Sequence, residues 1–213
     1  MTNKTLRRDA ELNRQRLLEA AAELFRTRGL EITLDDVAEH AGVGVGTAYR
    51  RFANKDELID ALLESRIDAM VAMAERGLED PDPWDGLVGY IVGALELQVR
   101  DRGLKEVLFA PGRGRKRVAG AKSRLAPVVS RLAARAREAG VVRQDFDTSD
   151  IPMIYLMLGT VVDFSRDAEP ELYQRYLAIL LEGIRAGGQP PELPVPALDI
   201  ARFQEAMAAY KSR

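Results

Sequence analysis

The sequence predicts an all-α protein with a small N-terminal three-helix domain followed by a larger helical domain. Apolar residues recur at spacings of three and four along most of the chain, as they do on one face of a helix. Glycine and proline clusters divide the chain into segments of helical length. The 213 residues, 46% of them apolar, suffice for two domains with a substantial core. We place these domains at residues 1–54 and 55–213.

The segment from residue 33 to residue 55 predicts two short helices joined by a tight glycine turn. Thr33 is expected as the N-cap of the first helix, with Asp35 and Asp36 in its first turn, where negative charge suits the helix dipole. Gly42 follows at the point where a helix commonly ends in a left-handed residue. The second helix is predicted to begin at Gly44, with inward positions at Val45, Ala48 and Phe52.

Two helices in this arrangement are typical of a helix-turn-helix, which presents its second helix to the major groove of DNA. Asn54 and Glu57 predict a capped start for the next helix. Lys55 lies in its first turn, where a phosphate commonly binds. From the pattern alone a second interpretation stands beside this one: helical proteins that never touch DNA also contain such pairs, and the basic residues are then an ordinary solvated face.

Residues 15–60 resemble the N-terminal domain of the tetracycline-repressor (TetR) family of transcriptional regulators. The resemblance rests on matches at fixed spacing without a gap: Leu17, Leu18, Ala21, Ala22, Leu24, Phe25, Gly29, Thr33, the run from Leu34 to Val43, the run from Gly46 to Phe52, Lys55 and Leu58. It implies a ligand-responsive regulator that is not an enzyme. We expect a repressor that binds a palindromic operator as a dimer and is released by a small-molecule effector.

The family's pattern of DNA contacts carries over onto nine positions, which are Thr33, Gly44, Val45, Gly46, Thr47, Tyr49, Arg50, Arg51 and Lys55. The resemblance implies that Thr33, Tyr49 and Lys55 contact phosphates. It also implies that residues 44–47 face bases or the sugar-phosphate edge. Gly44 stands where many relatives have serine or threonine, and Arg51 stands where the family often has histidine. Arg50 either binds guanine through O6 and N7 or pairs with a nearby carboxylate.

Composition excludes several classes of site. The chain has no cysteine, so it forms no disulfide and no thiolate metal site. His40 is the single histidine, and we expect no metal, no cofactor and no catalytic residue. No apolar run approaches the roughly 18 residues of a membrane span, and the polar first residues do not resemble a signal peptide. We therefore expect a cytoplasmic protein without a membrane partner.

The charge is unevenly distributed along the chain. The formal net charge is -2, yet residues 1–55 hold ten Lys and Arg against eight Asp and Glu. A locally positive surface on a mildly acidic body suits a protein that binds DNA reversibly. The basic stretch from Lys4 to Arg8 is either a disordered terminus or an arm that reaches DNA.

Beyond Asn54 the pattern predicts further helices, at about residues 55–78, 82–99, 104–109, 117–139, 148–166, 170–186 and 198–210. The helices over 148–166 and 170–186 are unusually apolar, and the first of them is apolar nearly all round. Such a helix must be buried on every side. We therefore predict a homodimer through about residues 148–186, joined as a four-helix bundle. A two-fold dimer would place its recognition helices about 34–36 Å apart, or a multiple of that distance.

The middle helices leave room for a ligand pocket. Methionine adapts to irregular shapes, and a few polar groups can orient a small apolar ligand. The candidate wall residues, each of which is equally an ordinary core residue, are Met70, Met73, Trp84, Tyr90, Gln98, Phe109, Met153, Tyr155 and Met157. The effector is unknown. The alternative function is that of a helical small-molecule-binding protein without sequence-specific DNA binding.

Overall fold

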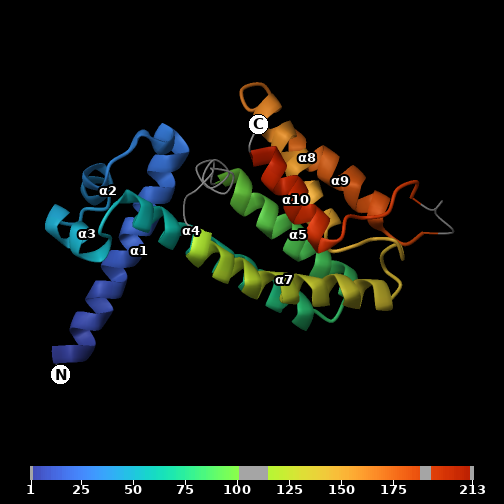
Figure 1. The fold of residues 1–213 in the computed structure, drawn as a ribbon, viewed down its shortest axis with the longest axis horizontal. Coiled ribbons are helices and arrows are strands. Elements are labelled where there is room, and N and C mark those ends of the chain that lie inside the picture. Colours follow the sequence, from blue (N-terminus) through green and yellow to red (C-terminus); the bar gives the residue numbers. More distant parts are fainter. Residues whose placement is uncertain (1, 101–114, 188–192, 212–213) are drawn as a thin grey trace. The chain divides into compact units, whose positions relative to one another are not determined.

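The computed structural model describes residues 2–100, 115–187 and 193–211, and within them the prediction of an all-α fold is confirmed (Figure 1). These residues form one 3₁₀ turn, an isolated β-bridge between Val142 and Arg185, and a series of α-helices. The predicted short helix over residues 104–109 lies outside the described residues. The helical elements are α1 (Thr2–Arg28), η1 (Gly29–Glu31), α2 (Leu34–His40), α3 (Val45–Arg51), α4 (Lys55–Glu79), α5 (Pro83–Arg100), α7 (Arg115–Glu138), α8 (Asp150–Ser165), α9 (Leu172–Ile184) and α10 (Ile200–Lys211).

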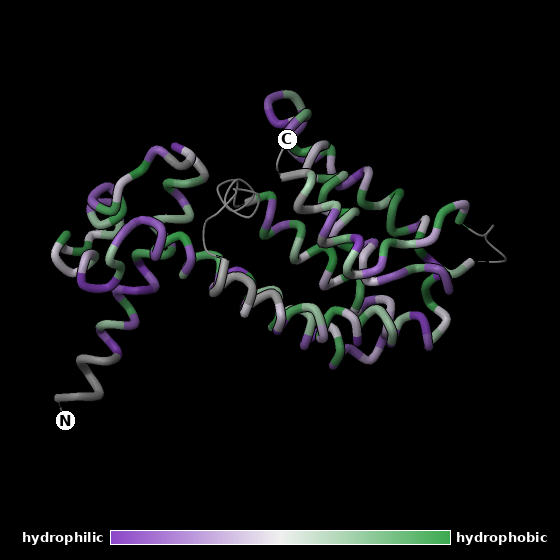
Figure 2. The backbone as a smooth tube through the Cα atoms, in the orientation of Figure 1, coloured by the Kyte–Doolittle hydropathy of each residue, from purple (hydrophilic) through white to green (hydrophobic). Residues whose placement is uncertain are grey.

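The chain forms two compact units, each with its own hydrophobic core. The N-terminal unit is built around Met1–Ile67, and the C-terminal unit around Asp68–Val99 and Lys122–Arg213. Helix α4 therefore begins in one unit and ends in the other. Hydrophobic and hydrophilic residues alternate along the helices of both units (Figure 2), as expected when each helix buries one face.

In the N-terminal unit α2 and α3 pack against each other, and α2 packs against α1. The N-terminal turns of α1 extend beyond α2 and α3 (Figure 1). The segment that includes Lys4–Arg8 is therefore helical in the structure. The core is small and formed by residues from α1, α2, α3 and the start of α4, among them Leu17, Phe25, Ile32, Val37, Ala48, Phe52 and Leu58.

Local sequence signals set the boundaries of these short helices. Thr33 caps α2 in a reciprocal capping box with Asp36, so the expected N-cap is confirmed. Gly42 has φ +63°, the left-handed conformation that glycine adopts without steric cost. The Asn54 side chain accepts from the backbone N–H of Glu57 at 2.9 Å, which caps α4. The Glu57 carboxylate in turn accepts from the backbone N–H of Ala53.

The C-terminal unit depends on contacts between residues far apart in sequence. Helices α4 and α5 approach so closely at Gly77 and Gly86 that a Cβ atom built on Gly77 would lie 2.5 Å from the Gly86 carbonyl oxygen. Arg135 on α7 donates to the carbonyl oxygens of Gly77 and Asp80 and so satisfies the end of α4. Tyr90, Leu132 and other apolar side chains of α5, α7 and α8 form the core around this crossing.

Within the single chain the helix over 148–166 is buried on one face only, and its complete burial stays a prediction for the homodimer. Helix α8 buries Ile151, Ile154 and Leu158 on one face. Met153, Met157 and Phe164 of the same helix are exposed, although α9 packs against α8. Only Leu177 of α9 is fully buried. The single chain therefore leaves a surface on this helix pair that the apolar sequence alone assigned to the interior.

Candidate functional site

Helix α3 presents a continuous outer face. Tyr49 and Val45 are 49% and 46% exposed, and Gly46, Arg50 and Arg51 are exposed as well. Ala48 and Phe52 point into the core, as predicted. Val45 was expected to point inward, and the structure corrects this: as the first residue of α3 it lies at the open end of the helix. Gly44 is the N-cap and provides no capping side chain.

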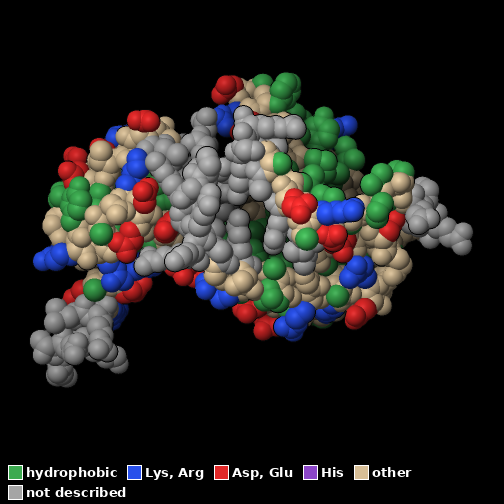
Figure 3. Space-filling view, in the orientation of Figure 1, with side chains coloured by type: hydrophobic (Ala, Val, Ile, Leu, Met, Phe, Trp, Pro, Cys, Tyr) green, Lys and Arg blue, Asp and Glu red, His purple; other side chains and the backbone are tan. Residues whose placement is uncertain are grey.

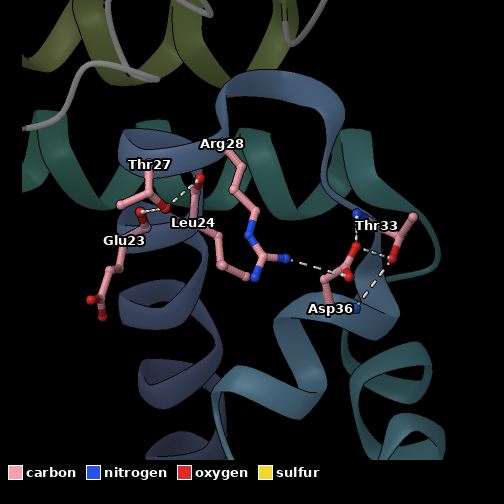
Figure 4. Close-up of polar contacts among 6 residues, drawn as sticks. All are labelled: Glu23, Leu24, Thr27, Arg28, Thr33 and Asp36. Atoms are coloured by element: carbon pink, nitrogen blue, oxygen red, sulfur yellow. Dashed lines mark hydrogen bonds and ion pairs between the residues drawn. The ribbon is translucent and has the colours of Figure 1, made fainter.

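The start of α2 is held by a network of charged hydrogen bonds (Figure 4). The Asp36 carboxylate accepts from the Thr33 backbone N–H at 2.7 Å and from the Thr33 hydroxyl. Arg28 approaches the same carboxylate, with Nη1 3.8 Å from Oδ1. The hydrogen bonds from Thr33 are the main reason that the pKa of Asp36 is lowered, and the charge of Arg28 lowers it further. The Thr33 hydroxyl, an implied phosphate contact, therefore donates to a carboxylate in the DNA-free protein.

Further implied contact residues of α3 also have partners within the N-terminal unit. The Asp35 carboxylate beside Tyr49 raises the pKa of the Tyr49 phenol, which stays neutral and able to donate. Arg50 donates to the Thr47 hydroxyl at 2.9 Å, so these two side chains lie together. Lys55 is the first residue of α4 and is half-buried. The nine residues thus group around α3 and the starts of its neighbouring helices.

Arg51 extends to α1 and there meets Glu11. Nη2 of Arg51 lies 3.3 Å from Oε2 of Glu11, and Nη1 of Arg14 lies 3.7 Å from the other carboxylate oxygen. Reasoning from sequence missed both Glu11 and Arg14, although Arg14 belongs to the basic residues of the N-terminal segment. The sequence shows that Glu11 and Arg14 lie three residues apart and so on one helix face. The contact of Glu11 with Arg51, however, depends on how α1 and α3 pack.

Five of the predicted pocket residues meet in the core of the C-terminal unit. Tyr90 is buried, and Met70, Met73, Trp84 and Tyr155 pack against the same core. The sulfur of Met73 would lie only 3.1 Å from a Cβ atom built on Gly93, so α4 and α5 are close here as well. Gln98 is half-buried further along α5. The structure therefore brings side chains of α4, α5 and α8 together.

Tyr155 and Tyr90 place two phenol groups within this core. Burial, more than any neighbouring group, raises the pKa of both phenols, and they stay neutral. The two hydroxyls are close enough to influence one another. The buried Tyr155 hydroxyl nonetheless makes no well-formed hydrogen bond with any group in the described residues. Tyr90 is its neighbour, and a buried hydroxyl whose hydrogen bonding is incomplete is a natural point for a ligand to hydrogen-bond.

Trp84 also has a contact outside this core, and two further pocket candidates are exposed. Trp84 is at the start of α5, and the Arg185 guanidinium carbon lies 4.8 Å from its ring centre, a cation–π contact near the surface. Met153 and Met157 are exposed on α8 and do not face Tyr155 or Tyr90 across the core. Phe109 lies outside the described residues.

The exposed apolar side chains of α8 and α9 form a second candidate site. On α8 the apolar residues Met153, Met157 and Phe164 stand at i, i+4 and i+11, with the polar Thr160 at i+7, so the four lie along one helix face. Phe164, at the end of this row, is 87% exposed. Hydrophobic side chains gather over these two helices (Figure 3). We call this surface the α8–α9 stripe; it comprises Met153, Met157, Thr160, Phe164, Tyr176, Ile179 and Gly183.

The part of the chain that the structure describes has neither a membrane-spanning helix nor a cluster of metal-binding side chains. Across residues 2–100, 115–187 and 193–211, no helix is long and apolar enough to cross a membrane. Over the same ranges no three acidic or histidine side chains come together as ligands of a metal ion.

Comparison with known families matches both units. Residues 17–62 match the family of bacterial regulatory proteins called the tetR family, and residues 82–186 match the C-terminal domain of SbtR-like transcriptional regulators. A curated HTH-type transcriptional regulator of Staphylococcus aureus is 37% identical over 67 residues. That alignment spans 31% of this chain and about a third (36%) of the relative's length.

Solved structures extend the similarity over most of the chain. A TetR transcription regulatory protein from Mycobacterium vanbaalenii is 30% identical with a TM-score of 0.66, and the match covers 84% of this chain and 99% of that one. The regulator FadR of Bacillus subtilis, solved in complex with stearoyl-CoA, shares the fold at 18% identity and a TM-score of 0.62, over 80% of this chain and 98% of FadR. The chain therefore belongs to the TetR family of helix-turn-helix transcriptional regulators, a family of DNA-binding proteins and not of enzymes.

Proposed function

We propose that this protein is a ligand-responsive repressor that binds a palindromic operator as a homodimer. The observation that carries the proposal is the outer face of α3, where Tyr49, Arg50 and Arg51 are exposed on a helix that a capped α2 and a glycine turn hold in place. A short polar helix held in this way is what the major groove accommodates. The proposal implies a cytoplasmic location, where operator DNA is accessible.

In this proposal residues 1–54 bind DNA and residues 55–213 provide regulation and dimerisation. Thr33, Tyr49, Arg51 and Lys55 contact backbone phosphates, which position the protein without reading sequence. Residues 44–47 face base edges or the sugar-phosphate backbone. Because Gly44 has no capping hydroxyl, phosphate contacts supply a larger share of the affinity than contacts from the start of α3.

Arg50 is the residue proposed to read a base. Its guanidinium bonds to Thr47 and forms no ion pair within the described residues, so the alternative of a surface arginine held by a carboxylate has less support. A guanidinium in the major groove pairs most often with O6 and N7 of guanine. Arg50→Ala is then expected to relax the preference at one base pair, whereas Tyr49→Phe and Lys55→Ala weaken binding to all sequences.

The dimer is proposed to form through about residues 148–186. The α8–α9 stripe supports this, because a row of exposed apolar side chains on two neighbouring helices is unfavourable in water and marks an interaction surface. Pairing of two such helix pairs gives a four-helix bundle. A two-fold dimer also gives each operator two recognition helices, about 34–36 Å apart or a multiple of that distance.

The effector is proposed to be a small, largely apolar molecule that binds among α4, α5 and α8. Support comes from the partly buried Met70 and Met73 and from the buried hydroxyl of Tyr155, which makes no well-formed hydrogen bond. The complex of the distantly related FadR with stearoyl-CoA is an example of a ligand bound by the same fold. Trp84 and Gln98 remain secondary candidates, and Met153 and Met157 are assigned to the dimer surface.

Release from DNA is proposed to proceed through α4, which runs from the DNA-binding unit to the ligand-binding unit. A ligand that binds better to one spacing of the two DNA-binding units shifts the population toward that spacing. A coupling free energy of about 1–3 kcal/mol changes operator affinity by a factor of about 5–150. Unchanged operator affinity at saturation would exclude a given ligand as the effector.

The decisive experiment is selection of bound sequences from random duplex DNA by the purified protein. The expected result is a palindrome whose half-site spacing matches the dimer, with affinity that falls steeply as salt increases. A chain that binds no duplex at low ionic strength contradicts the proposal. That result favours the alternative, a helical small-molecule-binding protein without sequence-specific DNA binding.

A further inference from the structure

Two arginines from different helices converge on one carboxylate in the N-terminal unit. Arg51, at the end of α3, and Arg14, on α1, approach opposite oxygens of Glu11, at N–O distances of 3.3 and 3.7 Å. Glu11 is the most exposed of the three side chains, at 65%. The three groups together carry a net charge of +1, so the cluster remains attractive to anions.

The chemistry of this cluster fits a second oxyanion. Guanidinium groups bind carboxylate and phosphate oxygens with the same planar set of N–H donors. Two guanidiniums gathered around one carboxylate therefore form an arrangement that also suits a phosphate. Because Glu11 is exposed, it can swing into water and leave its place to another anion. The ion pairs that it gives up are of the weak, solvent-screened kind.

We propose that Arg14 and Arg51 together form a site for a backbone phosphate of duplex DNA, and that the Glu11 carboxylate occupies this site in the DNA-free protein. The inference rests on the proposed DNA-binding function. It adds Arg14 to the implied contact residues, and it makes Glu11 a competitor of DNA for two cations. Because phosphates are the same in every sequence, Glu11 weakens binding to all duplexes and not to one operator.

The first test concerns Arg14. Binding of the full-length protein is measured by fluorescence anisotropy at several salt concentrations, with a selected operator and a random duplex of equal length. Arg14→Ala is expected to weaken binding to both duplexes and to reduce the slope of log affinity against log salt by up to about 0.9, the value of one phosphate contact, since Arg51 remains beside the phosphate. The matched control is Arg16→Ala, since residues two positions apart on a helix point to different faces.

The second test concerns Glu11. Glu11→Gln is expected to tighten binding to both duplexes, by up to about fivefold more than the control, since exposed ion pairs are weak. The control Asp9→Asn removes the same charge from a different face of α1. In a background that carries Arg14→Ala and Arg51→Ala, the gain from Glu11→Gln should fall to that of the control, because no cation is left to release.

Each outcome has a defined meaning. The inference is overturned if Arg14→Ala matches Arg16→Ala in affinity and salt slope, or if Glu11→Gln gains no more than Asp9→Asn. If the unaltered protein binds no duplex at low salt, the proposed function fails instead. Far-ultraviolet circular dichroism and thermal unfolding of each variant exclude loss of fold as the cause, and the exposed positions of these side chains make such loss unexpected.

Discussion

The two units of this protein differ in how far apart in sequence their defining contacts lie. In the N-terminal unit Thr33 bonds to Asp36 three residues away, and Asn54 bonds to Glu57 at the same spacing. In the C-terminal unit Arg135 bonds to the carbonyl oxygen of Gly77, 58 residues earlier. The helix-turn-helix is therefore specified mostly by residues that are neighbours along the chain. The C-terminal unit depends on contacts that form only when distant segments pack together.

The units also differ in the surfaces they offer to partners. The N-terminal unit exposes charged and polar groups that its own carboxylates hold, such as Thr33 with Asp36 and Arg51 with Glu11. The C-terminal unit exposes the apolar α8–α9 stripe. Salt concentration should therefore control how tightly a partner binds to the first surface. The apolar area that is buried should control how tightly a partner binds to the second.

The largest effect is expected from Met157→Glu in the middle of the stripe. A carboxylate buried in an interface without a partner costs about 3 kcal/mol or more, which corresponds to about 100-fold or more in dimer affinity. Light scattering after size exclusion should report a monomer at micromolar concentration. Gln174→Glu, two positions from Tyr176 and so on another face of α9, should leave the dimer intact. If the wild-type protein is itself monomeric, the α8–α9 stripe is not a dimer interface.

The next effect concerns the crossing of α4 and α5. A Cβ atom built on Gly77 would lie 2.5 Å from the Gly86 carbonyl oxygen, and a Cβ atom built on Gly86 would lie even closer to the Gly77 carbonyl oxygen. Gly86→Ala therefore forces the two backbones apart. Overpacking of this kind costs about 1–3 kcal/mol. Gly89→Ala on the same helix meets open space and should be neutral or stabilising by up to about 1 kcal/mol. Urea unfolding at one protein concentration compares the two, and equal stabilities would contradict the close crossing.

A smaller loss is expected at the cap of α2. Thr33→Ala removes the hydroxyl that accepts from the Asp36 backbone N–H and should cost about 1 kcal/mol of unfolding free energy. The measurement is thermal unfolding without DNA, so that any phosphate contact of Thr33 plays no part. Thr27→Ala is the control, because that hydroxyl bonds only to carbonyl oxygens of its own helix turn. If Thr27→Ala costs as much, capping is not the reason for the loss.

The smallest effect is expected at Asp145 in the C-terminal unit. Its hydrogen bond with Arg143 lowers the pKa of Asp145 to about 2. A lowered carboxyl pKa stabilises the fold above the unfolded-state value of about 3.9, and this contribution is lost as the pH falls through the folded value. Asp145→Asn should therefore lower the melting temperature at pH 7, and the difference from wild type should shrink between about pH 4 and pH 2. A difference independent of pH would assign the loss to packing.

Many local features could be predicted from the sequence because each depends on a few adjacent residues. The cap at Thr33, the left-handed turn at Gly42 and the start of α4 follow from side chains that bond to their own backbone. Beyond Asn54 the helical periodicity predicted the position of each described helix to within a few residues. The resemblance of residues 15–60 then indicated the family, which the comparisons show.

Only the tertiary structure decided which side chains meet and which faces remain open. The sequence predicted Met153, Met157 and Tyr155 alike as pocket residues, but packing leaves the two methionines exposed and buries the Tyr155 hydroxyl beside Tyr90 of α5. Glu11 and Arg51 are 40 residues apart, and no local rule joins them. The physical reason is that hydrogen bonds within a helix turn depend on neighbours in the chain. Packing and ion pairing depend on distances in space, which the chain acquires only when it folds.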